Sequence, residues 1–213
     1  MEEVRVDIKE IVKSLEGYRT IVLYDSVTPT IPIIKTLIEM YKEGYIVIFS
    51  NSAFRKFRII SNIAGIDTSN LKMVVMNETG RCGDAYACFS YEDLDDFVAF
   101  ASKLEGLIVL WGHWTLKRIV KEDRYWRLAF DVFDALHPKA WGFSFAPKHT
   151  YTPYERSLLS MLYDVTAIVK KVGEPYMFGE EVYSLEIFES VLKEVLPGTV
   201  YFMIDKDYSF IPR

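Results

Sequence analysis

The chain has 213 residues, of which 50% are hydrophobic and 26% charged, and this composition excludes an intrinsically disordered protein. Its net charge of -5 and pI of about 5.3 argue against a whole-molecule nucleic-acid surface, although a local basic patch is compatible with that average. No apolar run reaches the roughly 20 residues of a membrane span, and the opening MEEVRVDIKE lacks the apolar core of a signal peptide. We therefore expect a cytoplasmic protein without a membrane partner.

Apolar strands alternate with amphipathic helices along the chain, which is typical of a parallel sheet with helices on its faces. Helix stop signals include Gly17 and Gly44. The most apolar strand is GLIVLW at 106–111, which we expect to be central. In chain order the predicted elements are helix 4–15, strand 20–24, helix 31–43, strand 45–49, helix 55–64, strand 71–76, helix 91–104, strand 106–111, helix 124–136, strand 140–146, helix 153–163, strand 165–171, helix 184–195 and strand 199–204.

No linker, repeat or low-complexity tract divides this run, so we expect one domain over residues 1–213. It comprises an N-terminal helix at about 3–16, a core at about 20–171, and a C-terminal helix and strand at about 180–205. Residues 77–90 show no clear period.

Amide and thiol residues are scarce. Glutamine is absent and asparagine occurs four times, a depletion typical of proteins that work at high temperature, so we expect a thermophilic source. Cys82 and Cys88 are too few for a zinc site, and the three histidines match no ligand spacing, so no metal or cofactor is expected. Two free thiols are the simpler interpretation, and a disulfide stays open because hyperthermophile cytosols tolerate disulfides.

The beginning of the core joins the strand TIVLY, an eight-residue loop, a helix ending in KEG and the strand YIVIF. This order resembles the phosphate-binding unit of RecA-like ATPases, in particular their KaiC branch, and GLIVLW stands where their Walker B strand lies. Most of residues 20–171 continue the same order, and the chain is similar to an uncharacterised family of hyperthermophilic archaea among degenerate relatives of that superfamily. The resemblance implies a RecA-like α/β fold, a parallel sheet in three layers with a degenerate P-loop, and it implies no known activity.

The phosphate-binding loop of an ATPase needs glycines, a lysine and a hydroxyl residue in the pattern G-x-x-x-x-G-K-[ST]. Here the loop reads DSVTPTIP, so Thr30, Ile31 and Pro32 replace the second glycine, the lysine and the hydroxyl. The prolines lack an N–H donor, and Asp25 adds negative charge where the anion would lie. Lys35, one turn further on, is expected to be a solvated helix lysine.

The residues that follow the other strands show the same loss. A Walker B strand ends in an acidic residue that holds magnesium, whereas Trp111, Gly112 and His113 end this one. KaiC-type relatives carry acidic residues after the second strand, where this chain has SNSA at 50–53. Either nucleotide hydrolysis was lost, or the resemblance to these ATPases is only architectural. The absent Walker A and Walker B signatures favour a protein that is not an enzyme, and this question stays open.

Other candidate chemistries each have a simpler interpretation. The acidic residues of the helix at 91–104 suit its positive N-terminus better than a metal: Asp93, Asp95 and Asp96. His113 and Cys88 lack a partner set for acid–base or nucleophilic catalysis, although an unrelated enzyme using either stays open. The basic and aromatic stretch at 118–127 is interrupted by acidic residues, so nucleic acid is not expected there.

In open parallel sheets, ligands bind outside the carboxyl ends of the strands. The polar residues predicted to line that crevice are Asp25, Ser26, Asn51, Asn77, His113 and Lys148. Exposed aromatic anchors for a partner are expected at Trp114, Tyr125 and Trp126, with Trp111 in the core. The sequence thus predicts a non-catalytic domain that binds a protein or peptide, or its own copies. The alternative is a nucleotide or small-molecule sensor that binds through Lys148 or Lys35 without hydrolysis.

Overall fold

The computed structural model describes residues 8–172, 181–192 and 198–212. The strands are β1 (Arg19–Tyr24), β2 (Gly44–Ile48), β3 (Leu71–Asn77), β4 (Ala87–Ser90), β5 (Gly106–Trp111), β6 (Ala140–Pro147), β7 (Val165–Lys171), β8 (Val182–Ser190), β9 (Gly198–Ile204) and β10 (Phe210–Pro212). The helices are α1 (Ile8–Ser14), α2 (Thr30–Tyr41), α3 (Asn51–Ile63), α4 (Leu94–Ala101), α5 (Leu116–Ile119), α6 (Glu122–Ala135) and α7 (Pro153–Leu162), with 3-10 turns η1 (His113–Thr115) and η2 (Lys148–Thr150).

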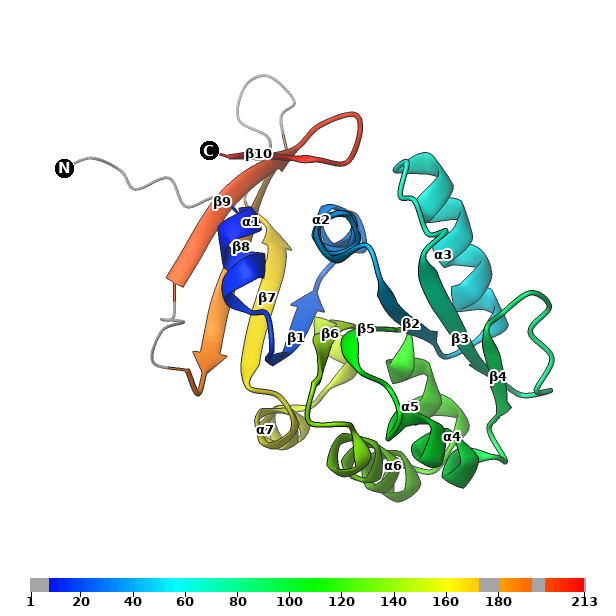
Figure 1. Cartoon of the computed structure of the whole chain (residues 1–213). Helices are drawn as coiled ribbons and strands as arrows, with labels where there is room; N and C mark the ends of the chain where they lie inside the picture. The colour runs from blue at the N-terminus through cyan, green and yellow to red at the C-terminus, as the bar shows by residue number, and fades with distance from the viewer. Residues whose placement is uncertain (1–7, 173–180, 193–197, 213) are drawn as a thin grey trace.

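The strands form one sheet in the order β10-β9-β8-β7-β1-β6-β5-β2-β3-β4 (Figure 1). Strands β7 to β4 in this order are parallel, and β8, β9 and β10 extend the sheet in antiparallel fashion. The predicted central strand, β5, is the fourth of the seven parallel strands and has the bounds expected from the sequence. Because parallel strands need a crossover between them, a helix follows most of them.

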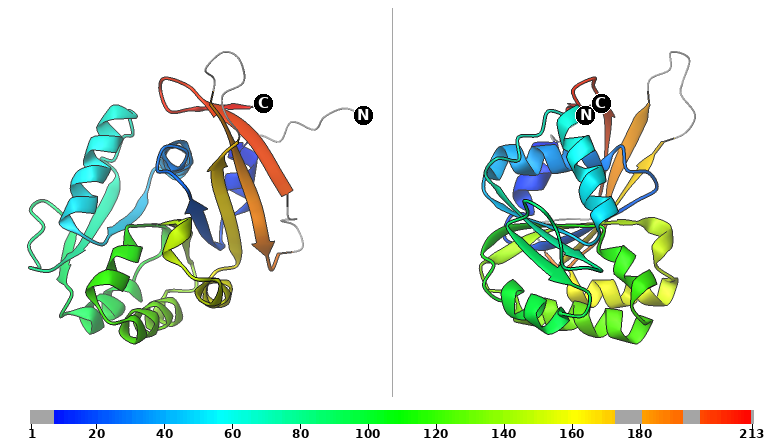
Figure 2. Two further views of the ribbon diagram at one scale, coloured as in Figure 1. Left: turned by 180° about the vertical axis from the view of Figure 1, so that it is seen from behind. Right: turned by 90° about the vertical axis from the view of Figure 1, so that its right-hand side faces the viewer.

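Helices cover both faces of the parallel part of the sheet, so the fold has three layers (Figures 1 and 2). α1, α2 and α3 pack on one face, whereas α4, α5, α6 and α7 pack on the other. In β2, Ile46 and Ile48 belong to the first core and Val47 to the second, as the two-residue period of a strand requires. The predicted α/β parallel-sheet fold class is confirmed, and no helix among the described residues has the length and apolarity needed to cross a membrane.

The predicted helix at 184–195 is wrong. Residues 182–190 form strand β8, which pairs antiparallel with β7, and residues 193–197 lie outside the described part of the chain. Tyr183, Leu185 and Ile187, at every second position, belong to the core on the α1 side, which is the period of a strand. Sequence alone did not predict the two short edge strands, β4 and β10.

Two glycines are required by close approach of neighbouring strands. α2 ends at Lys42, whose N–H donates to Ile38 O at 2.9 Å, and not at Gly44 as expected. Gly44 instead begins β2, where a Cβ would lie 2.7 Å from the Leu107 carbonyl oxygen. At Gly142 in β6, a Cβ would lie 1.8 Å from the Ile108 carbonyl oxygen, so only glycine fits at this position.

Candidate functional site

The candidate site is the sheet edge where β1, β2, β3, β5 and β6 end, because parallel strands bring their carboxyl ends together. The loop after β1 turns tightly into α2. The N–H groups of Thr30 and Ile31 donate to the carbonyls of Val27 and Thr28 at 3.0 and 3.2 Å, and the Thr30 hydroxyl also donates to Val27 O at 2.6 Å. These donors are satisfied within the loop, so they do not converge on an anion as the amides of a phosphate loop do.

The residues in the lysine and hydroxyl positions of a phosphate loop face the core. Ile31 and Pro32 are both buried, and Pro29, which precedes α2, makes no side-chain cap. Pro29 and Pro32 supply no N–H, so the start of α2 cannot offer a full set of donors. The first turn of α2 therefore contributes the Ile31 and Pro32 side chains to the hydrophobic core.

Asp25 joins the loop after β1 to the loop after β6. Its carboxylate lies 4.0 Å from Lys148 Nζ and 3.5 Å from His149 Nε2. All three side chains contact solvent to some degree, so each pair stabilises the fold weakly. The arrangement places a negative charge at the crevice with the Lys148 ammonium beside it.

Buried and capping groups replace the acidic groups of an ATPase at the ends of β5 and β2. Trp111 is buried against Phe57 and Phe145, which confirms the prediction that it belongs to the core. After β2, the Ser50 hydroxyl accepts from Ala53 N at 3.0 Å and caps α3. At these two strand ends the structure therefore has a core side chain and a helix cap in place of carboxylates.

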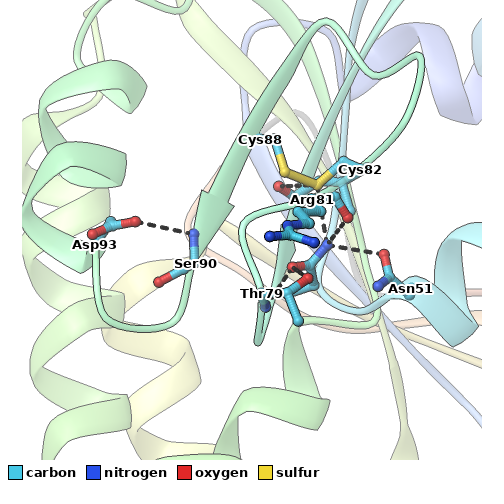
Figure 3. The surroundings of a disulfide bond; sticks show 9 residues. Asn51, Thr79, Arg81, Cys82, Cys88, Ser90 and Asp93 are labelled. Atoms are coloured by element: carbon cyan, nitrogen blue, oxygen red, sulfur yellow. Dashed lines mark hydrogen bonds between the residues drawn. A yellow bond between two sulfur atoms is a disulfide. The ribbon is translucent and has the colours of Figure 1, made fainter.

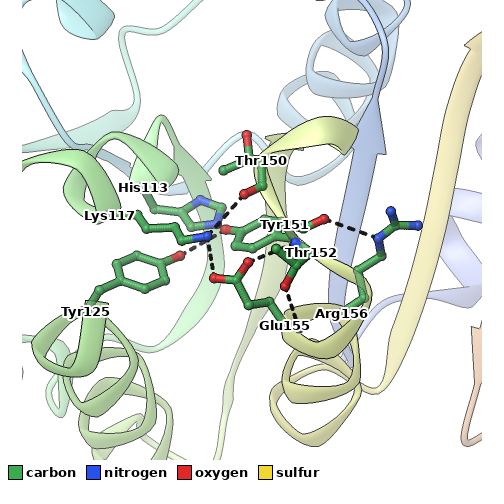
Figure 4. A network of polar contacts seen from close by, with 8 residues as sticks. All are labelled: His113, Lys117, Tyr125, Thr150, Tyr151, Thr152, Glu155 and Arg156. Carbon is green, nitrogen blue, oxygen red and sulfur yellow. Dashed lines mark hydrogen bonds and ion pairs between the residues drawn. The ribbon is translucent and has the colours of Figure 1, made fainter. Parts of the chain in front are cut away.

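His113 is buried beneath this edge and joins a polar network (Figure 4). The Tyr151 hydroxyl lies 3.1 Å from His113 Nε2 and 2.9 Å from the Tyr125 hydroxyl. Burial lowers the pKa of His113 to about 4 and raises that of Tyr125 to about 12, so both are neutral at pH 7. His113 Nδ1 has no hydrogen-bond partner among the described residues.

A second set of contacts continues the network across α5 and α7. Lys117 pairs with Glu155 and also donates to the Thr150 carbonyl at 3.2 Å. Thr152 and Glu155 form a reciprocal capping box at the start of α7. Burial raises the pKa of Glu155, but the bonds from Lys117 and Thr152 outweigh it and lower the pKa overall. These contacts tie the η1–α5 segment to α7, which is a structural role.

The predicted crevice residues differ in their contacts and burial. Asp25 and Lys148 pair with each other, and Asn77 Nδ2 donates to Asn51 Oδ1 at 2.9 Å. His113 and Asn77 are buried, whereas Ser26 is exposed. The structure thus brings the polar residues to one edge but engages most of them in internal contacts.

The expected exposure of Tyr125 and Trp126 is wrong, because both are buried on the inner face of α6. The sequence interpretation relied on the charged residues on either side of them. α6 begins at Glu122, and Tyr125 and Trp126 lie on the face of this helix that is buried together with Leu128 and Phe133. Trp114 is half-buried, with the Arg118 guanidinium 5.7 Å from its ring centroid. Tyr125 and Trp126 therefore cannot serve as surface anchors in this conformation.

Sequence reasoning missed Tyr151, Lys117 and Glu155. One signal was present, since T-P-Y-E at 152–155 is the pattern of a capping box with proline at the first helical position. His149, the second side chain beside the Asp25 carboxylate, was also missed, and it follows Lys148 directly in the sequence.

The cysteines form a disulfide, Cys82–Cys88, with their Cα atoms 5.8 Å apart, so the free-thiol interpretation is wrong. Cys88 lies in β4, where it pairs with Val75 of β3, and Cys82 lies in the loop that joins these two strands. The strand pairing therefore brings the two cysteines together. No group of three or more His, Cys, Asp or Glu side chains in the described residues is arranged to hold a metal ion.

Comparisons with known proteins define the fold class. No family model and no curated protein matches the chain. It is similar to the crystal structure of the KaiC-like protein PH0186 from the hyperthermophilic archaeon Pyrococcus horikoshii OT3, with a TM-score of 0.68 and 10% identity over 92% of this chain and 91% of that one. A second structure from the same organism, PH0250, gives a TM-score of 0.64 and 13% identity over 90% and 97% of the two chains. The chain therefore has a KaiC-like fold of the RecA type.

Proposed function

We propose that this chain is a non-catalytic binding domain built on a degenerate RecA-like fold. The observation that carries the proposal is the closed phosphate position. The amides of Thr30 and Ile31 are satisfied within the loop, two prolines lack an N–H donor, and the Asp25 carboxylate lies beside Lys148 and His149. The similarity to a KaiC-like protein of a hyperthermophilic archaeon supports a relation to degenerate archaeal members of that superfamily.

A partner surface is supported at α7 and the adjacent end of β8. Tyr154 and Met161 lie two turns apart on α7 and are 73% and 71% exposed. Phe188 and Val191 are also largely exposed, and Val191 N donates to the carbonyl of Asp164, just after α7. Exposed large apolar groups that gather in one region mark protein-interaction sites, so we place a protein or peptide partner, or a second copy, at this end.

Binding through this surface can be tested with glutamate substitutions at two apolar positions of similar exposure, 71% for Met161 and 65% for Ile63. Met161→Glu alters the proposed surface, whereas Ile63→Glu changes an exposed residue of α3 on the opposite face of the sheet. Sedimentation velocity tests self-association, and affinity capture from the source cell with the three forms tests other partners. We expect Met161→Glu to lose the association that wild type and Ile63→Glu retain. Equal association of all three forms would contradict the placement.

The alternative, a sensor that binds a nucleotide without hydrolysis, rests on the weak pairing of Lys148. Its ammonium lies 4.0 Å from Asp25, so a phosphate could replace the carboxylate. Lys35 is less available, because its Nζ donates to the Asp207 carbonyl at 2.5 Å. Calorimetric titration with ATP and magnesium tests this alternative: saturable binding that Lys148→Ala abolishes supports the sensor, and absence of binding contradicts it.

A further inference from the structure

A polar cleft of about 490 Å³ lies between α3 and the segment that the disulfide closes. Its volume is within the range of small-molecule sites. The cleft is separate from the carboxyl edge, because β3 contributes Leu71 and Met73 from its first half, whereas Asn77 ends that strand. The lining residues are Phe54, Arg58, Ser61, Asn62, Thr68, Leu71, Lys72, Met73, Asp84 and Tyr86.

The cleft carries positive charge although the chain is acidic. Arg58 and Lys72 line it with one acidic residue, Asp84. Arg58 Nη1 lies 3.6 Å from Asp84 Oδ1, and the two side chains are 58% and 76% exposed. Such an exposed pair is weak, so the carboxylate or phosphate of a ligand can replace Asp84 at Arg58.

Aromatic rings hold both cations and offer a surface for a flat ligand. The Lys72 ammonium lies 5.2 Å from the ring centroids of Tyr45 and Tyr86, and the Arg58 guanidinium lies 5.8 Å from that of Phe54. Tyr86 nevertheless remains 57% exposed. A ligand ring can therefore pack against Tyr86 while its anionic group reaches the neighbouring cations.

A buried hydroxyl in the lining is unsatisfied. Ser61 is only 4% exposed, and its Oγ has no hydrogen-bond partner within the described ranges. Buried polar groups are nearly always paired in native proteins, so an unpaired hydroxyl beside a cleft indicates a missing partner. The Oγ atom itself has almost no accessible surface, so a polar atom of a ligand would supply this partner after the Ser61 side chain rotates toward the cleft.

The disulfide between Cys82 and Cys88 (Figure 3) closes the loop that forms one wall of the cleft. This wall contributes Asp84 and Tyr86 to the lining. Both residues lie within the loop that Cys82 and Cys88 close. Asn77 Nδ2 donates to Cys82 Sγ at 3.1 Å and to the Arg81 carbonyl at 2.9 Å, and Tyr86 N donates to Met73 O at 2.8 Å. A wall fixed in this way is organised before binding, which reduces the entropy lost when a ligand binds.

We propose that this cleft binds a small planar aromatic compound that carries one anionic group, a phosphate or a carboxylate. The ring packs on Tyr86, the anion pairs with Arg58 and Lys72, and a polar substituent bonds Ser61. The inference concerns a different surface from the proposed partner site and does not depend on it.

Calorimetric titration of the full chain with two aromatic anions tests the proposal. AMP provides a phosphate and indole-3-acetate a carboxylate, while inorganic phosphate and adenosine lack the ring and the charge respectively. We expect AMP or indole-3-acetate to bind at least tenfold more tightly than inorganic phosphate and adenosine, and the one that binds identifies the anionic group. Binding by neither aromatic anion would overturn the proposal.

Variants locate that binding in the cleft. Arg58→Gln and Tyr86→Leu should each weaken it at least tenfold, because one removes the anion's partner and the other the packing surface. Arg55→Gln is the matched control, since Arg55 is an exposed arginine of the same helix that does not line the cleft. Far-ultraviolet circular dichroism confirms that each variant is folded. Equal affinity of Arg58→Gln and Arg55→Gln would refute the site.

Discussion

Acidification from pH 7 to pH 5 should destabilise this protein through His113. The ring is buried, and its pKa in the folded state is about 4 against an ordinary value of 6.5. Between these two values the unfolded chain binds a proton that the folded chain excludes. Unfolding is therefore favoured as the pH falls, and the stabilisation present above pH 6.5 is lost on the way to pH 4.

The magnitude follows from the two pKa values. Each unit of separation corresponds to about 1.4 kcal/mol, so His113 destabilises the folded state by about 3 kcal/mol when the pH has fallen below both values. Between pH 7 and pH 5 the expected loss is about 2 kcal/mol. For a chain of this size, that loss lowers the midpoint of thermal unfolding by about 4–8 °C.

Guanidinium unfolding followed by tryptophan fluorescence measures this effect, with His113→Gln as the reference. Glutamine keeps a polar group that can accept a bond from Tyr151 but does not titrate, so the difference between the two proteins isolates His113. The free energy of unfolding of the wild type should fall by about 2 kcal/mol more than that of His113→Gln between pH 7 and pH 5. Parallel pH profiles for the two proteins would refute a buried neutral His113.

Three further outcomes follow from the structure. Tyr151→Phe should cost about 2–4 kcal/mol of stability by denaturant unfolding, because it leaves His113 Nε2 and the Tyr125 hydroxyl without this partner. Tyr125→Phe removes only the last hydroxyl of this hydrogen-bonded series and should cost about 1 kcal/mol. Equal costs for the two variants would contradict the network. Gly142→Ala should destabilise the fold by about 3 kcal/mol, because its Cβ would collide with the Ile108 carbonyl oxygen. Gly65→Ala, which has open space around it, should cost about 1 kcal/mol through its left-handed backbone. Similar costs for the two variants would contradict the close approach of β5 and β6. Calorimetry should give an unfolding midpoint above roughly 90 °C, as the missing glutamine predicts, and a midpoint near 55 °C would refute a thermophilic source.

The parallel core could be predicted from the sequence because each strand is an apolar run followed by an amphipathic helix. GLIVLW at 106–111 and VTAIVKK at 165–171 have the predicted bounds. Prediction failed where the sheet becomes antiparallel: in β8, glutamates at 186 and 189 stand at helical spacing among apolar residues, although Tyr183, Leu185 and Ile187 are buried at the spacing of a strand. Only tertiary pairing with β7 decides between these two periods.

The candidate site was predictable in place but not in environment. Asp25, Asn51 and Lys148 follow the carboxyl ends of β1, β2 and β6, where ligands of open parallel sheets bind, but the sequence does not show which polar groups pair with one another. Burial of Trp126 depends on the register of α6, and the surroundings of Tyr151 depend on contacts between segments far apart in the chain. The cleft beside α3 likewise arises from a helix, a strand and a disulfide-closed loop that no local pattern connects.

Release of inorganic phosphate from ATP and GTP, measured with magnesium and purified protein, tests the central claim most directly. If the loop at Asp25–Pro32 and the strand end at Trp111 have lost the groups that hold phosphate and magnesium, as we propose, the rate should equal that of the buffer. A turnover above this background that disappears in Asp25→Ala or His113→Gln would contradict the account.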